Sequence, residues 1–305
     1  MNAALDALFA TVLDCNGRPL SLDRPRVVGI LNVTPDSFAD GGQYADTASA
    51  VAHGLKMAEQ GADMLDVGGA STRPGADEVS PDEELRRMLP VIEQLVAQTK
   101  LPISIDTSHA DVMRAAVAAG AGMINDVYAL RREGALDVAA ALGVPVCLMH
   151  MQGEPRDMQD DPRYGDVVGE VHRFLTDRLF ACELAGIDKR KVLVDPGFGF
   201  GKTLEHNLAL LAALERFGNL GSGVYAGLSR KSMIGALTQR TDPADRVAGS
   251  VAAALIAVQR GARLVRVHDV AETVDALAVW RGVHAIDNVP RRADKPVTPR
   301  WPDDE

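Results

Sequence analysis

The sequence predicts a single-domain α/β protein, a (β/α)8 TIM-type barrel, from the number of its strands, their apolar character and the helices between them. Eight short apolar runs recur, at residues 27–33, 63–69, 101–108, 122–128, 145–150, 191–197, 224–230 and 263–270. Runs that are apolar throughout are typical of parallel strands in a sheet covered by helices. Eight strand–helix units close a barrel more readily than they form an open sheet.

Segments with helical periodicity lie between these runs, for example at 48–62, 82–98, 110–121 and 244–262. Several end in glycine just before the next strand, as expected for the residue after a helix. A chain of 305 residues also fits two domains, but a barrel often exceeds about 250 residues as one domain. We therefore predict a barrel at 25–285, an N-terminal extension at 1–24 that closes its bottom, and a disordered proline-rich tail at 286–305.

The composition excludes several classes of protein. The net charge of −10 argues against a general nucleic-acid or anionic-membrane surface, so any anion site must be local. Cys15, Cys147 and Cys182 lack CxxC spacing, which disfavours disulfides and structural zinc. The first residues carry no basic segment of a signal peptide, and no apolar run is long enough to span a membrane. We expect a cytoplasmic protein.

Polar residues end nearly every predicted strand. They are Asn32, Asp66, Asp106, Asn125, Asp126, His150, Asp195, Ser229, Arg230, Lys231, Arg266 and His268. One such residue alone is as well explained as a helix cap, but a series over eight strands favours a shared mouth at the carboxyl ends of the barrel strands. We expect carboxylates at the floor of this mouth and basic groups at its rim.

Asp106, Asn125 and Asp195 are expected to converge deep in the mouth. Carboxylates match the edge of a flat heterocycle that carries adjacent N–H donors. Metal ligation and general acid–base chemistry are the alternatives for these side chains. Because no His or Cys cluster accompanies them, a transition-metal site is disfavoured. Met149 is expected in the apolar wall.

The basic residues Arg73, Lys231, Arg266 and His268 suggest a pocket for a phosphate or diphosphate. Surface salt bridges are the alternative. Asn32 is either a strand-end cap or a ligand of Mg²⁺ that binds against the anion. Two long loops, 32–44 and 68–80, are predicted lids. The segment 195–203 resembles a P-loop but has Pro196 where that motif needs glycine, so we interpret it as a strand followed by a tight turn.

The motifs together resemble the dihydropteroate synthase family. They are LNVTPDSF (31–38), STRPG (71–75), SIDTS (104–108), INDV (124–127), LMHMQG (148–153), DPGFGFGK (195–202), SRKSMIG (229–235) and RVHDV (266–270). The resemblance covers about residues 25–285. It implies a pterin-binding barrel, a target of sulfonamides, that joins 6-hydroxymethyl-7,8-dihydropterin diphosphate to 4-aminobenzoate with Mg²⁺ and works as a homodimer.

The resemblance also implies roles for residues. The pterin would contact Asp106, Asn125, Asp195, Lys231, Met149 and Phe200. The diphosphate would contact Arg73, Arg266, His268 and, through Mg²⁺, Asn32. The aminobenzoate would contact Phe38, Thr72, Pro74, Ser229 and Ser232. Catalysis would depend on Arg73, Asp106, Lys231, Arg266 and His268.

Ala70 departs from the family pattern, which has Glu at this position of the second loop. This departure supports one alternative, a catalytically silent pterin-binding paralogue. A separate alternative is another pterin-barrel enzyme, a methyltetrahydrofolate–corrinoid methyltransferase, which does not need the diphosphate cluster or the STRPG loop.

Overall fold

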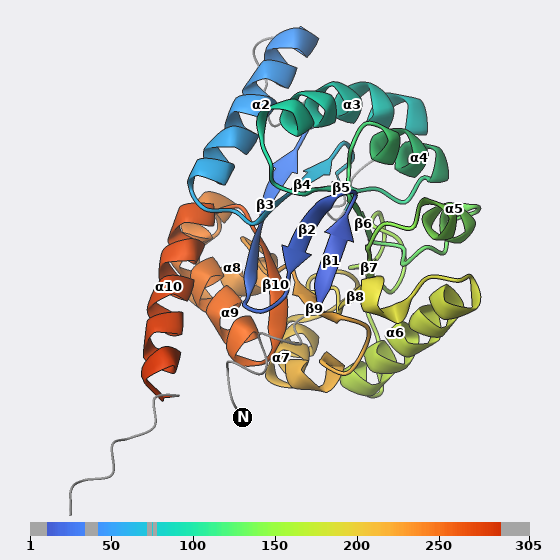
Figure 1. Cartoon of the computed structure of the whole chain (residues 1–305). Coiled ribbons are helices and arrows are strands. Elements are labelled where there is room, and N and C mark those ends of the chain that lie inside the picture. Colours follow the sequence, from blue (N-terminus) through green and yellow to red (C-terminus); the bar gives the residue numbers. More distant parts are fainter. Residues whose placement is uncertain (1–10, 34–41, 72–74, 76–77, 288–305) are drawn as a thin grey trace, which may run out of the picture.

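The fold is a closed barrel of eight parallel strands surrounded by helices (Figure 1). The structure is a computed structural model and describes residues 11–33, 42–71, 75 and 78–287. The barrel strands are β3 (Arg26–Asn32), β4 (Met64–Gly68), β5 (Ile103–Asp106), β6 (Met123–Asp126), β7 (Val146–Met149), β8 (Val192–Asp195), β9 (Gly223–Ala226) and β10 (Ala262–Val267). Each corresponds to one predicted strand, and β10 pairs with β3 to close the ring. The prediction of a (β/α)8 barrel is confirmed.

Helices cover the outside of the barrel, as expected when every strand is buried on both faces. They are α2 (Gly42–Glu59), α3 (Pro81–Gln98), α4 (Ala110–Ala118), α5 (Ala135–Leu142), α6 (Val167–Leu184), α7 (Leu204–Ala212), α8 (Ser232–Thr238), α9 (Val247–Gln259) and α10 (Val270–Asp287). The glycine predicted after a helix is confirmed at Gly143 and Gly261, whose φ angles of 66° and 94° suit a residue without a side chain.

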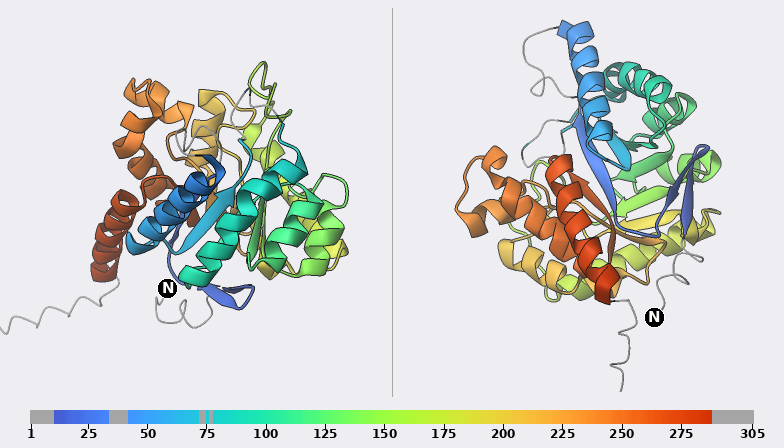
Figure 2. Two further views of the ribbon diagram at one scale, coloured as in Figure 1. Left: turned by 90° about the horizontal axis from the view of Figure 1, so that it is seen from above. Right: turned by 60° about the vertical axis from the view of Figure 1, so that its left-hand side comes forward.

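An antiparallel hairpin, β1 (Val12–Cys15) and β2 (Arg18–Ser21), lies at the end of the barrel where the parallel strands begin (Figures 1 and 2). Its apolar residues Leu13, Cys15 and Leu20, with Leu22, form one buried cluster with inward side chains of the barrel. Those side chains are Val28, Met64, Met123, Cys147, Leu193, Tyr225 and Leu264. The hairpin therefore covers this end of the barrel interior.

Polar contacts fix the hairpin to the carboxyl ends of two helices. The guanidinium of Arg18 donates to the carbonyls of Val96, Thr99 and Leu101 at 2.7–2.8 Å, at and just beyond the end of α3. The amide of Asn16 donates to Val117 and Ala121, near the end of α4, at 3.2 and 3.1 Å. These side chains supply donors to carbonyls at and beyond the carboxyl ends of α3 and α4, where donors from within the helix run out.

Gly122 is the closest point between the hairpin and the barrel. A Cβ atom added there would lie 2.2 Å from the carbonyl oxygen of Cys15. Because this neighbour is backbone, we expect Gly122→Ala to displace the hairpin and to lower the free energy of unfolding by roughly 1–3 kcal/mol. Urea unfolding measures the effect.

Gly282→Ala is the matched control, since nothing lies within 4 Å of its added Cβ. In the interior of α10 this change is expected to be neutral or to stabilise the protein by up to about 1 kcal/mol. Equal unfolding midpoints for the Gly122→Ala variant and the wild type would contradict the close packing of the hairpin.

Candidate functional site

The candidate site lies inside the barrel, at the ends of the strands opposite the hairpin. Strand register places Asn32, Gly68, Asp106 and Asn125 side by side on four consecutive strands. Gly68 leaves room between its neighbours, since a Cβ atom there would lie 3.4 Å from Cβ of Asp106 and 3.8 Å from Oδ1 of Asn32. Asn32 and Asp106 therefore face the same space above Gly68.

A single guanidinium bridges two acidic side chains at the floor of this space. Nε of Arg266 lies 2.6 Å from Oδ2 of Asp66, and its Nη2 lies 3.0 Å from Oδ2 of Asp106. Burial disfavours the charged form of Arg266, but the two carboxylates outweigh it and its pKa stays above the ordinary value. Burial raises the pKa of Asp106 to about 7; Arg266 opposes this shift and Asp66 adds to it.

Asp66 also fixes the orientation of the Asn125 amide. The same oxygen that accepts from Arg266 accepts from Nδ2 of Asn125 at 3.1 Å. Asp66 lies in the middle of β4 and is completely buried, so it belongs to the floor and not to the end of its strand as predicted. With its amino group held by Asp66, Asn125 leaves its carbonyl oxygen for other partners.

Asp195 and Lys231 form the opposite side of the floor. Oδ1 of Asp195 accepts the N–H of Gly197 at 2.7 Å. A Cβ atom at Gly227 would lie 3.9 Å from Oδ2 of Asp195 and 4.0 Å from Cβ of Arg266, so the predicted meeting of these two side chains is observed. Burial raises the pKa of Asp195, while the charge of Lys231 opposes it. Burial lowers the pKa of Lys231 to about 8, against the pull of Asp195.

The turn at 197–201, which follows β8, carries part of the site. Lys231 donates to the carbonyl of Phe198 and lies 4.5 Å from the centre of the Phe200 ring. A Cβ atom at Gly199 would lie 3.1 Å from Cδ of Lys231, and φ at this glycine is +79°. Glycine is therefore required where the lysine side chain passes over the turn.

Met149 and Phe200 belong to one small apolar cluster above the floor. Met149 is buried there with Val127, Met151 and Met158, and Phe200 packs against them. This cluster provides the apolar wall that the sequence predicted beside the carboxylates.

Two neighbouring residues of the loop after β9, Ser229 and Arg230, have different partners. Ser229 and His268 are joined, Oγ to Nδ1, at 2.9 Å, and the N–H of His268 donates to the same hydroxyl at 3.1 Å. Arg230 forms an ion pair with Asp269 at 2.5 Å and so does not serve the floor. His268 follows the last residue of β10, whereas the sequence predicted it within the strand.

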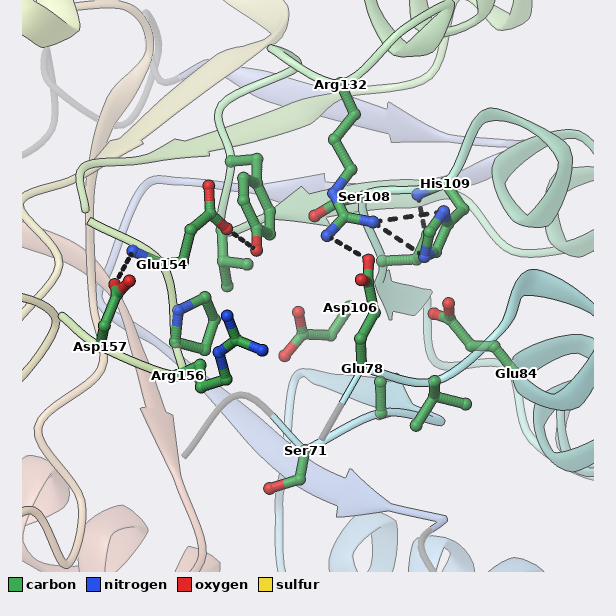
Figure 3. A pocket seen from close by; sticks show the side chains of 16 residues that line it. Ser71, Glu78, Glu84, Asp106, Ser108, His109, Arg132, Glu154, Arg156 and Asp157 are labelled. Carbon is green, nitrogen blue, oxygen red and sulfur yellow. Dashed lines mark hydrogen bonds and ion pairs between the residues drawn. The ribbon is translucent and has the colours of Figure 1, made fainter. Parts of the chain in front are cut away.

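A pocket of about 360 Å³ adjoins the floor at Asp106 (Figure 3). Arg132 lies over the ring of Tyr128 at 4.3 Å and forms an ion pair with Glu78 at 2.8 Å. Burial raises the pKa of Glu84, which also lines this pocket, to about 7. His109, without a role in the sequence prediction, is 3.1 Å from Arg132.

Other predicted residues have different positions. Ser232 is the exposed first residue of α8, directly after Lys231. Phe38, Thr72, Arg73 and Pro74 lie outside the described residues, so their predicted contacts with substrates stay predictions.

Two residues of the site had no assigned role in the sequence prediction. Asp66 shares the strand-end signal with its neighbours, and only the fold distinguishes it as the partner of both Arg266 and Asn125. Lys202 lies in the segment 195–203, which the sequence analysis interprets only as a strand followed by a tight turn. It is 3% exposed and contacts the backbone of the 197–201 turn.

Comparison with known proteins gives a consistent result. The sequence matches the family described as pterin binding enzyme over residues 28–268. It is 51% identical over 267 residues to dihydropteroate synthase of Escherichia coli strain K12, covering 88% of this chain and 94% of that protein.

Solved structures agree. The dihydropteroate synthase of Xanthomonas albilineans with 4-aminobenzoic acid is 65% identical, with a TM-score of 0.87, and the match covers 92% of this chain and all of that one. The same enzyme in complex with 7,8-dihydropteroate matches with 62% identity and a TM-score of 0.84, over the same shares of both chains. The chain thus belongs to the pterin-binding enzyme family and, within it, to the dihydropteroate synthases.

Proposed function

We propose that this protein joins 6-hydroxymethyl-7,8-dihydropterin diphosphate to 4-aminobenzoate, forming 7,8-dihydropteroate and releasing diphosphate. The observation that carries the proposal is the convergence of Asp106, Asn125 and Asp195 with Lys231 and Arg266 at one floor. The Xanthomonas relative in complex with 7,8-dihydropteroate supports it.

The free oxygens of the floor suit the donor edge of a pterin. Oδ2 of Asp106 accepts from Arg266, and Oδ1 of Asp195 accepts from the Gly197 N–H. The amino group of Asn125 donates to Asp66. Each keeps one oxygen for the ligand. The ring amino group and the neighbouring N–H of a pterin are donors, so they match these acceptors, while Lys231 supplies a donor and Met149 an apolar contact.

The guanidinium of Arg266 has capacity for an anion beyond its two carboxylates. Its five N–H donors include two on Nη1 and a second on Nη2 that no described contact with Asp66 or Asp106 uses. We propose that these bind the diphosphate together with His268 and Arg73. Charge-assisted bonds of this kind stabilise the anion as it leaves.

Asn32 is the proposed ligand of a magnesium ion in this arrangement. Its side-chain oxygen lies at the mouth beside Asp106. No group of three His, Cys, Asp or Glu residues in the described ranges is arranged to hold a metal. Asn32 therefore fits an ion whose other ligands are water and substrate phosphate, as Mg²⁺ prefers. When bound, the ion would offset negative charge on the diphosphate.

The aminobenzoate is proposed to lie on the side of Ser229 and Ser232, with Phe38, Thr72 and Pro74 as further contacts.

In the reaction, the bond from the pterin methylene carbon to the diphosphate oxygen breaks, and its electron pair leaves with the diphosphate. The amine lone pair forms the new C–N bond and the nitrogen then loses a proton. Asp106 and Asp195 would stabilise positive charge on the pterin between these events, which favours departure before attack; a concerted displacement is the alternative.

A homodimer is proposed through the late helices of the barrel. Leu208 of α7, Leu237 of α8 and Ile256 of α9 are 37%, 56% and 42% exposed. Apolar side chains on neighbouring helices are suited to burial in such an interface.

No helix within the described ranges has both the length and the apolarity to cross a membrane. The cytoplasmic location stays a prediction.

The central prediction is that diphosphate release requires both substrates. Purified protein with dihydropterin diphosphate and Mg²⁺ should release diphosphate at a high rate only after 4-aminobenzoate is added, and a coupled diphosphate assay measures it. A silent paralogue would bind pterin without release. A corrinoid methyltransferase would show neither release nor a response to 4-aminobenzoate.

Asp195→Asn tests how the floor recognises the pterin. The N–H of Gly197 keeps an oxygen of the side chain turned toward the turn, so the new amide would present its NH₂ group to the donor edge of the ligand. We expect the dissociation constant of 7,8-dihydropteroate to rise roughly 100-fold. Calorimetry measures it, and Asp188→Asn, a change in the exposed Asp188–Arg190 ion pair before β8, is the control. Unchanged affinity would remove Asp195 from the pterin site.

The charge of Lys231 predicts a pH dependence of binding. Its pKa of about 8 means that the ammonium loses its proton as the pH rises through that value. Pterin affinity should therefore weaken as the pH rises through about 8, because a neutral amine is the poorer donor. In Lys231→Met the affinity should be low and the alkaline decline absent. A decline that persists in this variant would assign it to another group.

A further inference from the structure

Lys202 is a buried lysine whose hydrogen-bond partners, among the residues that the structure describes, include no carboxylate. Its Nζ lies 2.9 Å from the carbonyls of both Gly197 and Phe200, 3.0 Å from Nδ1 of His150 and 3.3 Å from the carbonyl of His150. The N–H donors of Nζ are shared among these four partners. Lys202 thus joins the 197–201 turn to the loop that follows the adjacent strand β7.

The two segments meet backbone to backbone at this place. A Cβ atom at Gly197 would lie 1.9 Å from the carbonyl oxygen of His150, and one at Gly201 would lie 2.3 Å from that of Gln152. Lys202 therefore occupies the seam between two closely packed segments, and no other side chain in the described part of the chain donates to the carbonyls of Gly197 and Phe200.

Other bonds hold the remaining groups of the turn in place. The N–H of Gly199 donates to Asn207 at 2.7 Å, its carbonyl accepts from Gln159 at 2.5 Å, and the hydroxyl of Tyr164 donates to Gly201 at 2.8 Å. The carbonyl of Phe198 accepts from Lys231. The shape of the turn therefore decides where Lys231 lies.

The same turn acts on two further groups of the floor. Its Gly197 N–H binds Asp195, and its Phe200 ring lies beneath the Lys231 ammonium. We propose that Lys202 is a positioning residue: it holds the 197–201 turn in the shape that orients Asp195, Lys231 and Phe200 for the pterin. The inference rests on the proposed function, because it names what shapes that same site.

The electrostatics of the seam agree with this geometry. Burial lowers the pKa of His150 to about 2, and Lys202 adds to that shift, so the imidazole is neutral and its ring nitrogen accepts. Burial also lowers the pKa of Lys202 itself, and the charge of Asp195 opposes that shift. The carbonyls of Gly197, Phe200 and His150 can only accept, so Nζ donates to this seam in either protonation state.

The test compares Lys202→Met with Lys191→Met. Lys191 also donates to a glycine carbonyl, that of Gly143 at 2.7 Å, but it precedes β8 at the opposite end of the barrel. Lys202→Met should raise the dissociation constant of 7,8-dihydropteroate roughly tenfold, since donors to buried acceptors are lost. Amides of residues 197–201 should exchange hydrogen faster, while those of β3–β6 stay protected. Lys191→Met should change neither.

Lys202→Gln, which keeps two N–H donors, provides the same comparison if the Met variant does not fold. Affinity within twofold of wild type despite faster exchange, or lost affinity with unchanged exchange in the turn, would overturn the proposal. Wild-type protein that fails to bind dihydropteroate would instead count against the proposed function. In that case, hydrogen exchange in the variants still tests whether Lys202 stabilises the 197–201 turn.

Discussion

The site depends on one arginine that pairs with two buried carboxylates. Arg266 of β10 reaches past β3 in the closed ring and bonds Asp66 of β4 and Asp106 of β5. A lone buried carboxylate is strongly unfavourable, and removing one partner of such a group typically costs about 3–5 kcal/mol. The arginine thus lets two acidic side chains remain at the centre of a protein interior, where they can meet a ligand without first losing water.

From this pairing the orientation of the other polar groups follows. Asp66 is saturated on one oxygen by Arg266 and Asn125 together, so the amide of Asn125 has a fixed direction. On the opposite side of the floor, backbone groups orient the side chains: the Gly197 N–H donates to Asp195, and the Phe198 carbonyl accepts from Lys231. Because these partners are in place before any ligand arrives, the floor needs little reorganisation on binding, and preorganised dipoles of this kind contribute most to catalysis.

The fold, and most of the residues that form the floor, could be predicted from the sequence because both depend on local patterns that recur along the chain. Apolar runs give the strands, and topology alone brings Asp106, Asn125, Asp195 and Arg266 to one place. The pairing among them could not be predicted. The sequence suggested an acidic floor and a separate basic rim, whereas Arg266 lies in the floor itself because Asp66 is in mid-strand. Lys202 was overlooked for a related reason: its partners are backbone carbonyls, which carry no sequence signal, and its burial comes from the packing of β7 and β8 loops.

The mixture of charges in the floor also explains why one site can serve both halves of the proposed reaction. Three carboxylates, Asp66, Asp106 and Asp195, face two cations, Arg266 and Lys231. In the proposed reaction, the unused N–H groups of Arg266 would face the negative charge of the attached diphosphate. Once that charge departs, the excess of carboxylate would remain beside the pterin, where positive charge develops. The pKa of Asp106, about 7, sets how large this excess is near neutrality, since burial and Asp66 oppose its ionisation and Arg266 favours it. The same guanidinium therefore adjusts both the anion site and the stabilisation of the cation, and neither can be altered without the other.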